Sequence, residues 1–106
     1  MKPIDGTPFG DEIAEHSQND VTQMIQKAAS VANELARLSP ADHAKLLRTI
    51  GVHIESAREQ LVATACAETA LAEGRIGGEI TRTTVQFNRF AELVETGEHL
   101  KVAIDK

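Results

Sequence analysis

The residues of this sequence that could do chemistry are a single cysteine, four histidines and a short glycine cluster. Cys66 stands between alanines in a helical stretch, and no histidine or basic residue lies three or four positions from it. Because a reactive thiolate needs such a neighbour to stabilise it, we expect Cys66 to pack as a small apolar side chain. A single cysteine also excludes an internal disulfide framework and a cysteine-based zinc site.

Two acid–histidine pairs have the spacing of neighbours on a helix surface, Glu12 with His16 and Glu95 with His99. Each pair offers fewer ligands than a metal site needs, so we interpret both as solvated pairs. The His53-Ile54-Glu55 segment matches half of a zinc-deaminase signature whose cysteine half is absent. A metal-binding helical bundle would need inward E-x-x-H motifs, which the sequence does not contain. We therefore predict no metal ligands.

The glycine cluster Gly74-Arg75-Ile76-Gly77-Gly78 invites comparison with phosphate-binding loops. It matches neither G-x-G-x-x-G nor a Walker A loop, and no predicted strand precedes it. We interpret it as a connection between two helices. Phe87 and Phe90 are expected in the core, and Arg75, Arg82 and Arg89 read as scattered charges.

Charge and composition narrow the class of partner. The chain has 106 residues, with 11 basic and 16 acidic side chains and a net charge of −5. This balance argues against nucleic acid and anionic membranes as partners. The sequence shows neither a signal peptide nor an apolar run long enough to span a bilayer, so we expect a soluble, cytoplasmic protein.

The elements that must position these residues are predicted to be helices over most of the chain. Residues 1–16, punctuated by prolines and glycines, form an irregular lead-in. A helical region follows over residues 17–98. Residues 99–106 form a tail whose alternating apolar and charged residues fit a single strand without a partner in this chain.

Capping residues mark where the first two helices begin. Ser17 is the expected N-cap of the first, with Asp20 in the position of a capping box, and apolar residues then recur to Ala36. The second begins at Ser39-Pro40, with proline at the first helical position. Gly51 lies inside this second helix and indicates close packing there.

Two further helices complete the predicted fold. The third runs from about residue 57 to 73, the glycines then break the chain, and the fourth runs over 79–96 with Gly97 as its left-handed C-cap. The pattern predicts an all-α fold of three or four amphipathic helices. Adjacent helices could also be fused in the isolated chain or swapped between protomers.

One stretch resembles a known family. Residues 65–79, ACAETALAEGRIGGE, are followed closely by Arg82-Thr83-Thr84-Val85-Gln86-Phe87. Together they resemble the N-terminal region of the NAD(P)-dependent aldehyde dehydrogenase superfamily, in which Glu68-Thr69 stands where members commonly read Glu-Thr-Gly. The Arg-Thr-Thr segment with the following glutamine is similar to the branch that oxidises 2-oxoglutarate semialdehyde (2,5-dioxopentanoate).

The resemblance extends over residues 7–106. Ser17 to Ala36 and Ser39 to Ile54 are similar to the first two helices of the family, and residues 102–105 to the start of the strand that follows. Three positions depart from the pattern. Ala70 replaces a usual glycine and Ala72 a usual proline, which would lengthen the third helix, and His43 stands where arginine is common.

The resemblance implies a role for the chain within a larger α/β enzyme. The catalytic cysteine, the glutamate base, the asparagine that holds the oxyanion and the cofactor segment of the family lie further along than residue 106. We therefore predict that this chain contains no catalytic, cofactor-binding or metal-binding residues. NAD(P) belongs to the intact family and is not expected to bind this chain, which we expect to be inactive alone.

One residue is a candidate for substrate contact by resemblance. The predicted fourth helix borders the substrate tunnel in the family, so Arg82 could face that tunnel and attract a substrate carboxylate. A solvent-exposed arginine on a helix is the simpler interpretation of the same residue.

The alternative function is a stand-alone helical module for self-association or interaction. Apolar helix faces shaped to pack against a missing neighbour would seek replacement partners, most simply copies of the same chain. We therefore expect a homo-oligomer.

Overall fold

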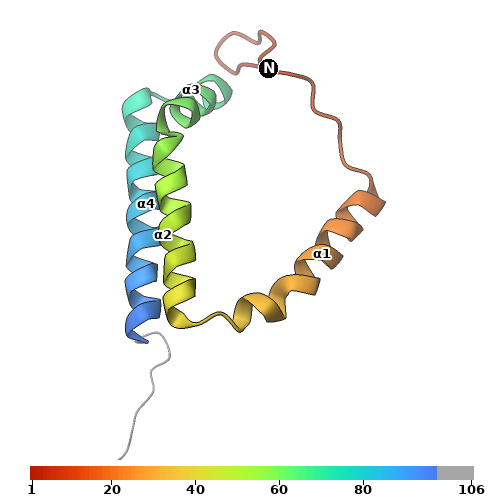
Figure 1. The fold of residues 1–106 in the computed structure, drawn as a ribbon. Helices are drawn as coiled ribbons and strands as arrows, with labels where there is room; N and C mark the ends of the chain where they lie inside the picture. Colours follow the sequence, from red (N-terminus) through yellow and green to blue (C-terminus); the bar gives the residue numbers. More distant parts are fainter. Residues whose placement is uncertain (98–106) are drawn as a thin grey trace, which may run out of the picture. The chain divides into compact units, whose positions relative to one another are not determined.

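The computed structural model describes residues 1–97 and divides into two units, each treated separately below. The unit Gly10–Ser39 contains α1 (Gln18–Ala36). The other unit contains Met1–Phe9 and the described residues from Pro40 onward, with three helices (Figure 1): α2 (Pro40–Ser56), α3 (Arg58–Thr69) and α4 (Glu73–Thr96). Every regular element within residues 1–97 is a helix, which confirms the predicted all-α class.

Helix α1 begins at the predicted capping box. The Ser17 hydroxyl accepts a hydrogen bond from the Asp20 amide at 3.1 Å, and the Asp20 carboxylate accepts one from the Ser17 amide at 2.9 Å. Two amides that the first helical turn leaves without partners are thereby satisfied. The Ser17 bonds hold the pKa of Asp20 below its ordinary value, because they favour the charged carboxylate.

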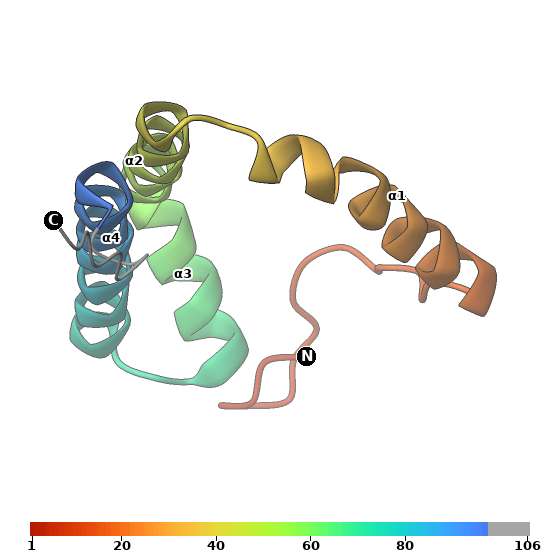
Figure 2. The same cartoon turned by 90° about the horizontal axis from the view of Figure 1, so that it is seen from below.

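Helices α2 and α4 lie side by side along their length in both views (Figures 1 and 2). Small residues let them approach closely: Ala44 and Gly51 of α2 and Ala91 of α4 are buried. A Cβ atom added to Gly51 would lie 3.6 Å from Cβ of Phe87. This proximity confirms the close packing that Gly51 indicates in the sequence.

An ion pair joins these two helices near the end of α4. The Arg48 guanidinium donates through Nη1 and Nη2 to the two carboxylate oxygens of Glu95, each at 2.7 Å. A two-bond arrangement of this kind constrains the direction of both side chains as well as their distance. It holds the pKa of Glu95 below its ordinary value and raises that of Arg48.

Helix α3 leaves the end of α2 at an angle (Figure 2) and is tied to α4 by one arginine. Arg58 donates to the carbonyl of Gly77 at 2.9 Å and to the hydroxyl of Thr81 at 2.8 Å. Its Nε also donates to Glu55 at 2.7 Å. One side chain in the first turn of α3 therefore connects the end of α2 with the beginning of α4.

The predicted break at the glycines is wrong. Helix α4 begins at Glu73, so Gly74, Gly77 and Gly78 lie in its first two turns. Buried Ile76 and Ile80 explain this outcome, because their apolar side chains are packed only if these turns are helical. The Arg58 bond to the Gly77 carbonyl adds a tertiary contact that compensates for the low helix propensity of glycine.

The expected lengthening of the third helix by Ala70 is also wrong. Helix α3 ends at Thr69, and Ala70 takes the left-handed conformation at φ 60°. Its amide donates to the carbonyl of Cys66 at 2.9 Å, and the Leu71 amide donates to the Thr69 hydroxyl at 3.2 Å. These bonds close the helix with an alanine in a position that glycine normally takes.

The chain ends outside the helices differ in how much the structure describes. Met1–Phe9 contains a turn in which Asp5 accepts from the amide and hydroxyl of Thr7 at 3.0 and 2.7 Å. Gly97 closes α4 in the left-handed conformation at φ 72°, as predicted. The predicted strand in the tail lies outside the described residues.

Candidate functional site

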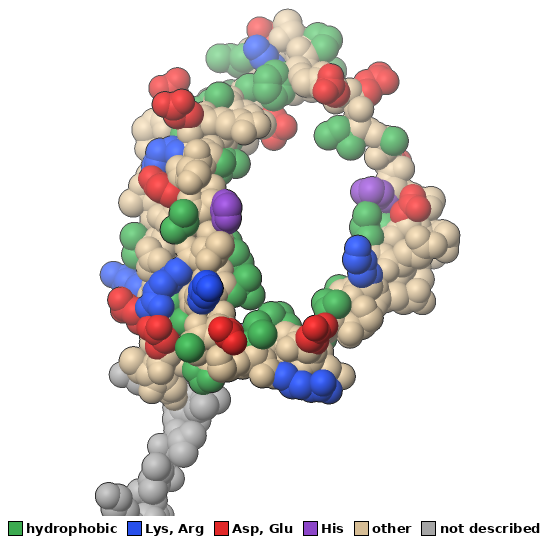
Figure 3. Space-filling view, in the orientation of Figure 1, with side chains coloured by type: hydrophobic (Ala, Val, Ile, Leu, Met, Phe, Trp, Pro, Cys, Tyr) green, Lys and Arg blue, Asp and Glu red, His purple; other side chains and the backbone are tan. Residues whose placement is uncertain are grey.

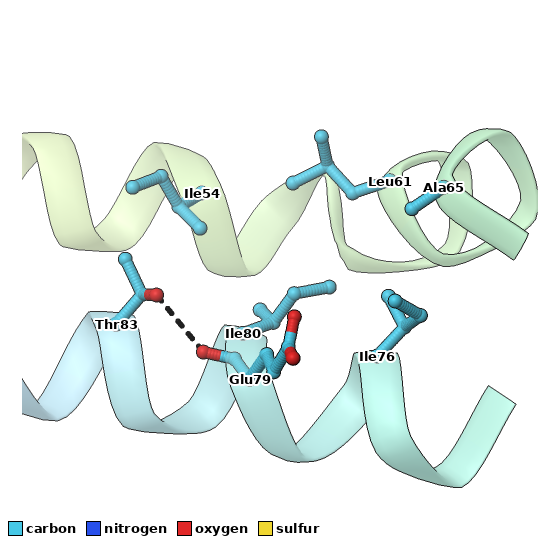
Figure 4. Close-up of a pocket in the computed structure, with 7 residues that line it drawn as sticks. All are labelled: Ile54, Leu61, Ala65, Ile76, Glu79, Ile80 and Thr83. Atoms are coloured by element: carbon cyan, nitrogen blue, oxygen red, sulfur yellow. Dashed lines mark hydrogen bonds between the residues drawn. The ribbon is translucent and has the colours of Figure 1, made fainter. Parts of the chain in front are cut away.

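The candidate site is an apolar groove of about 380 Å³ on the three-helix unit. Figure 4 shows side chains from all three helices facing it. Its lining residues are Ile54 of α2, Leu61 and Ala65 of α3, and Ile76, Glu79, Ile80 and Thr83 of α4.

The two polar side chains of this groove contact groups of their own helix. The Thr83 hydroxyl donates to the backbone carbonyl of Glu79 at 2.9 Å, as the dashed line in Figure 4 shows. The Glu79 carboxylate lies 3.6 Å from Nε of Arg75. The Arg75 and Glu79 side chains are both more than half exposed, which is typical of a weak, solvated contact.

A second apolar groove, of about 280 Å³, shares Thr83 with the first. It is lined by Leu47 of α2 and by Thr83, Gln86, Phe87 and Phe90 of α4. Phe90 is 53% exposed, so the prediction that it lies in the core is wrong, whereas Phe87 is half-buried and packs near Gly51. The outward ring of Phe90 enlarges the apolar surface next to the first groove.

The two grooves can bind apolar side chains. Leu61 in the first groove is 40% exposed, and Figure 3 shows apolar side chains between the charged ones along these helices. Burial of such surface against a partner is favourable at about 25 cal/mol per Å². The arrangement fits a surface that docks another protein segment better than a reaction centre.

An ion pair joins the end of α2 to the first turn of α3. Arg58 donates to Glu55 with two nitrogens, at 2.7 and 2.9 Å. These bonds hold the pKa of Glu55 below its ordinary value and raise that of Arg58. Glu55 is thus occupied by a structural ion pair.

The other sequence candidates, Arg82 and Cys66, line neither of the two grooves. Arg82 is exposed on α4 and lines neither groove. Cys66 is half-buried within α3, as expected for a packed thiol. Within residues 1–97, no three histidine, cysteine or acidic side chains form a group that could hold a metal ion.

The structure describes both residues of only one of the two acid–histidine pairs. Glu12 and His16 precede α1 in irregular chain, so the interpretation of this pair as a helix-surface pair is wrong. Glu95 is bound to Arg48, and His99 lies outside the described residues.

The glycines of α4 do not form a loop of the phosphate-binding kind. Gly74, Gly77 and Gly78 lie in a regular helix, in which most backbone amides bond along the helix itself. Phosphate-binding glycine loops instead direct free amides toward the ligand after a strand.

None of the helices in residues 1–97 has the length and apolar character that a membrane crossing requires.

Two ion-pair networks were not predicted from the sequence. Arg58 with Glu55 has a three-residue spacing on consecutive helical turns, which was an available signal. Arg48 and Glu95 are 47 positions apart, and no sequence spacing indicates their contact.

Comparison with known proteins places these features in a family. The Aldehyde dehydrogenase family matches residues 1–105. Alpha-ketoglutaric semialdehyde dehydrogenase 2 of Azospirillum brasilense is 33% identical over 104 residues, 98% of this chain and 19% of that protein. Alpha-ketoglutaric semialdehyde dehydrogenase of Acinetobacter baylyi is 30% identical over 105 residues, 99% of this chain and 20% of that protein.

The match covers almost all of this chain but only part of each relative. The chain spans about a fifth of the length of the two curated relatives. Their names agree with the branch that the sequence resembles. No solved structure matches the chain significantly.

Proposed function

Because the chain belongs to the aldehyde dehydrogenase family, we propose that it supplies the N-terminal helices of an enzyme that oxidises an aldehyde to a carboxylic acid with NAD(P). The observation that carries the proposal is the family match over residues 1–105 in a chain one-fifth as long as its relatives. The apolar grooves support it, since they offer surface for the rest of such an enzyme.

We propose that the isolated chain does not catalyse this reaction. Aldehyde oxidation of this kind needs a thiolate nucleophile, donors for an oxyanion, a hydride-accepting nicotinamide and a base that activates water. Cys66 is a half-buried helical residue, and the three glycines of α4 do not form a phosphate loop. The chain alone is accordingly expected to bind no NAD(P).

The substrate class we propose is a semialdehyde that carries a carboxylate. The names of both relatives support this class. Arg82, exposed on α4, has the charge to attract such a carboxylate at the substrate tunnel. Its role is electrostatic attraction and positioning of the substrate.

A chimera tests the family role. This chain would replace the matching segment of the Azospirillum brasilense enzyme, and oxidation of alpha-ketoglutaric semialdehyde would be measured by NAD(P)H absorbance. We expect the chimera to be active and the isolated chain to show neither activity nor NAD(P) binding. An insoluble or inactive chimera, or activity that follows the pure isolated chain, would contradict the proposal.

The same chimera tests Arg82. We expect Arg82→Ala to raise KM for the semialdehyde about tenfold or more with little change in kcat, since a charge-assisted contact is removed. Arg89→Ala removes an equal charge elsewhere on α4 and should leave KM unchanged. An uncharged aldehyde should show no difference between the two variants. Equal KM values for the semialdehyde would exclude Arg82 from substrate attraction.

A second candidate function for the isolated chain is self-association, in the cytoplasm. Large apolar side chains exposed in both units, among them Ile25, Leu61 and Phe90, support it. Sedimentation measured over a range of protein concentration tests this candidate. We expect the average mass to rise with concentration, and a constant monomer mass would contradict it.

A further inference from the structure

Helix α1 carries a regular apolar stripe. Val21, Met24, Ala28, Val31 and Leu35 alternate in steps of three and four along it. This spacing corresponds to the a and d positions of a heptad, where a helix meets another helix in a coiled coil. The four large side chains of the stripe are each between 44% and 51% exposed. The stripe is therefore an apolar face of which about half remains exposed.

Charged residues flank this stripe at a second regular interval. Asp20, Lys27 and Glu34 are seven residues apart, each directly before an a position. They occupy the g positions, which set orientation and partner choice in paired helices. The sign alternates from negative to positive to negative along the helix. This alternation makes the pattern of charges sensitive to how a second helix is aligned.

We propose that α1 pairs antiparallel with α1 of a second copy of this chain. The inference rests on the proposed self-association and assigns it to a surface. In an antiparallel pair the g positions of the two helices face each other. Lys27 of each copy then lies opposite Glu34 of the other, which gives two reciprocal ion pairs.

The same alignment pairs the apolar residues in layers. Met24 faces Leu35 of the second copy, and Ala28 faces Val31, with both contacts repeated by symmetry. The small alanine is thus set against a larger side chain in each central layer, which favours even packing. Val21 faces the residues just beyond Ala36, where Leu38 continues the apolar pattern.

Other alignments are less favourable on the same residues. A shift of one heptad in one direction places Lys27 opposite Lys27, and a shift in the other places Glu34 opposite Glu34. Each shift also reduces the number of apolar layers. A parallel pair sets Lys27 near Ala32 and Asp20 near Ile25, which forms no ion pair and leaves Ala28 opposite Ala28. Charge complementarity therefore selects both the orientation and the register.

Charge reversal tests the pairing in the full chain. We expect Lys27→Glu or Glu34→Lys to weaken dimerisation about tenfold or more in sedimentation equilibrium at low salt, because attractive pairs become repulsive. Lysine, arginine and glutamate are all good helix formers, so α1 should keep its helicity in circular dichroism. Lys45→Glu, an equal reversal at an exposed position of α2, should leave dimerisation unchanged.

Two combinations supply the decisive comparison. The double variant Lys27→Glu, Glu34→Lys restores opposite signs and should recover dimerisation. An equimolar mixture of the two single variants should form a heterodimer in which each negative helix meets a positive one. Failure of both to recover association would overturn the inference.

The outcomes separate this inference from the proposed self-association. If the unchanged protein dimerises and both single reversals behave as Lys45→Glu, the α1 pairing is wrong while self-association stands. If the unchanged protein is monomeric at every concentration, both the α1 pairing and the proposed self-association are wrong. Neither outcome bears on the family assignment.

Discussion

Ala70 adopts a backbone conformation that alanine disfavours. It is the only non-glycine residue with positive φ within residues 1–97. An L-residue in the left-handed region is destabilised by about 1–2 kcal/mol relative to the right-handed region. The turn forms nevertheless, because Ile76 and Ile80 immediately after it must be placed in the core.

Replacing this alanine by glycine should stabilise the protein. We expect Ala70→Gly to raise the free energy of unfolding by about 0.5–1 kcal/mol, since glycine adopts this φ without a steric penalty. Urea unfolding followed by circular dichroism measures the change. Ala63→Gly, at an exposed position inside α3, is the matched control and should destabilise by about 1 kcal/mol. A destabilised Ala70→Gly variant would contradict the assigned conformation.

Gly51 allows a graded test of the α2–α4 contact. A Cβ at this position would make ordinary contacts, the nearest at 3.6 Å. We expect Gly51→Ala to be more stable by about 0.5–1 kcal/mol, because alanine has the higher helix propensity. Gly51→Leu should be destabilised by about 1–3 kcal/mol, since its larger side chain would force the helices apart. Urea unfolding distinguishes the two, and a stable leucine variant would disprove close packing.

At the scale of elements, some helix ends could be predicted from the sequence and others could not. The capping residues of α1, the proline that begins α2 and the glycine that ends α4 act through their own backbone and near neighbours. Such local signals are legible in a sequence. The junction between α3 and α4 depends on contacts between segments. The glycines predicted a break in the helix there, and that prediction was wrong.

The capping box gives a prediction for α1. We expect Ser17→Ala to destabilise the first turn of this helix by about 1 kcal/mol, because the Asp20 amide loses its acceptor. Amide hydrogen exchange at the start of the helix should become faster. Ser30→Ala, inside the same helix, should leave that exchange unchanged or slower, since alanine is the better helix former. Equal exchange in both variants would contradict the cap.

At the scale of the whole molecule, contacts between distant segments hold the three-helix unit together. The Arg48–Glu95 ion pair connects α2 with the last turn of α4, and Arg58 connects α2, α3 and α4. Periodicity predicted the existence of the helices, and a glycine inside the second predicted helix indicated close packing at Gly51. It could not indicate which arginine meets which carboxylate, because such pairings follow from three-dimensional proximity rather than spacing. The outward position of Phe90 was missed for the same reason.

The Arg48–Glu95 pair predicts how stability depends on pH. Because the pKa of Glu95 is lowered in the folded state, the ion pair stabilises that state at pH values above 4.5, the ordinary pKa of this carboxyl group. Stability should be lost as the pH falls through the folded pKa and the carboxylate takes a proton. Glu95→Gln should therefore lower the urea midpoint at pH 7, with the difference from the unchanged protein shrinking toward acid pH.

A matched carboxylate provides the control for this pH dependence. Glu68→Gln removes one charge from an exposed position of α3. It should change the urea midpoint little at any pH. If the two glutamine variants gave the same pH profile, the bidentate pair would contribute nothing to stability.

The packing of α2 also has a consequence for synthesis on the ribosome. This helix buries Ala44 and Gly51 mainly against α4, and α3 lies between the two helices in the sequence. A nascent chain that ends before Glu73 has no surface on which α2 can bury that face, and an isolated helix of this length is marginal in water. The three-helix unit should therefore fold in a late step, after Thr96 has left the exit tunnel. Until then, the apolar face of α2 is available to chaperones.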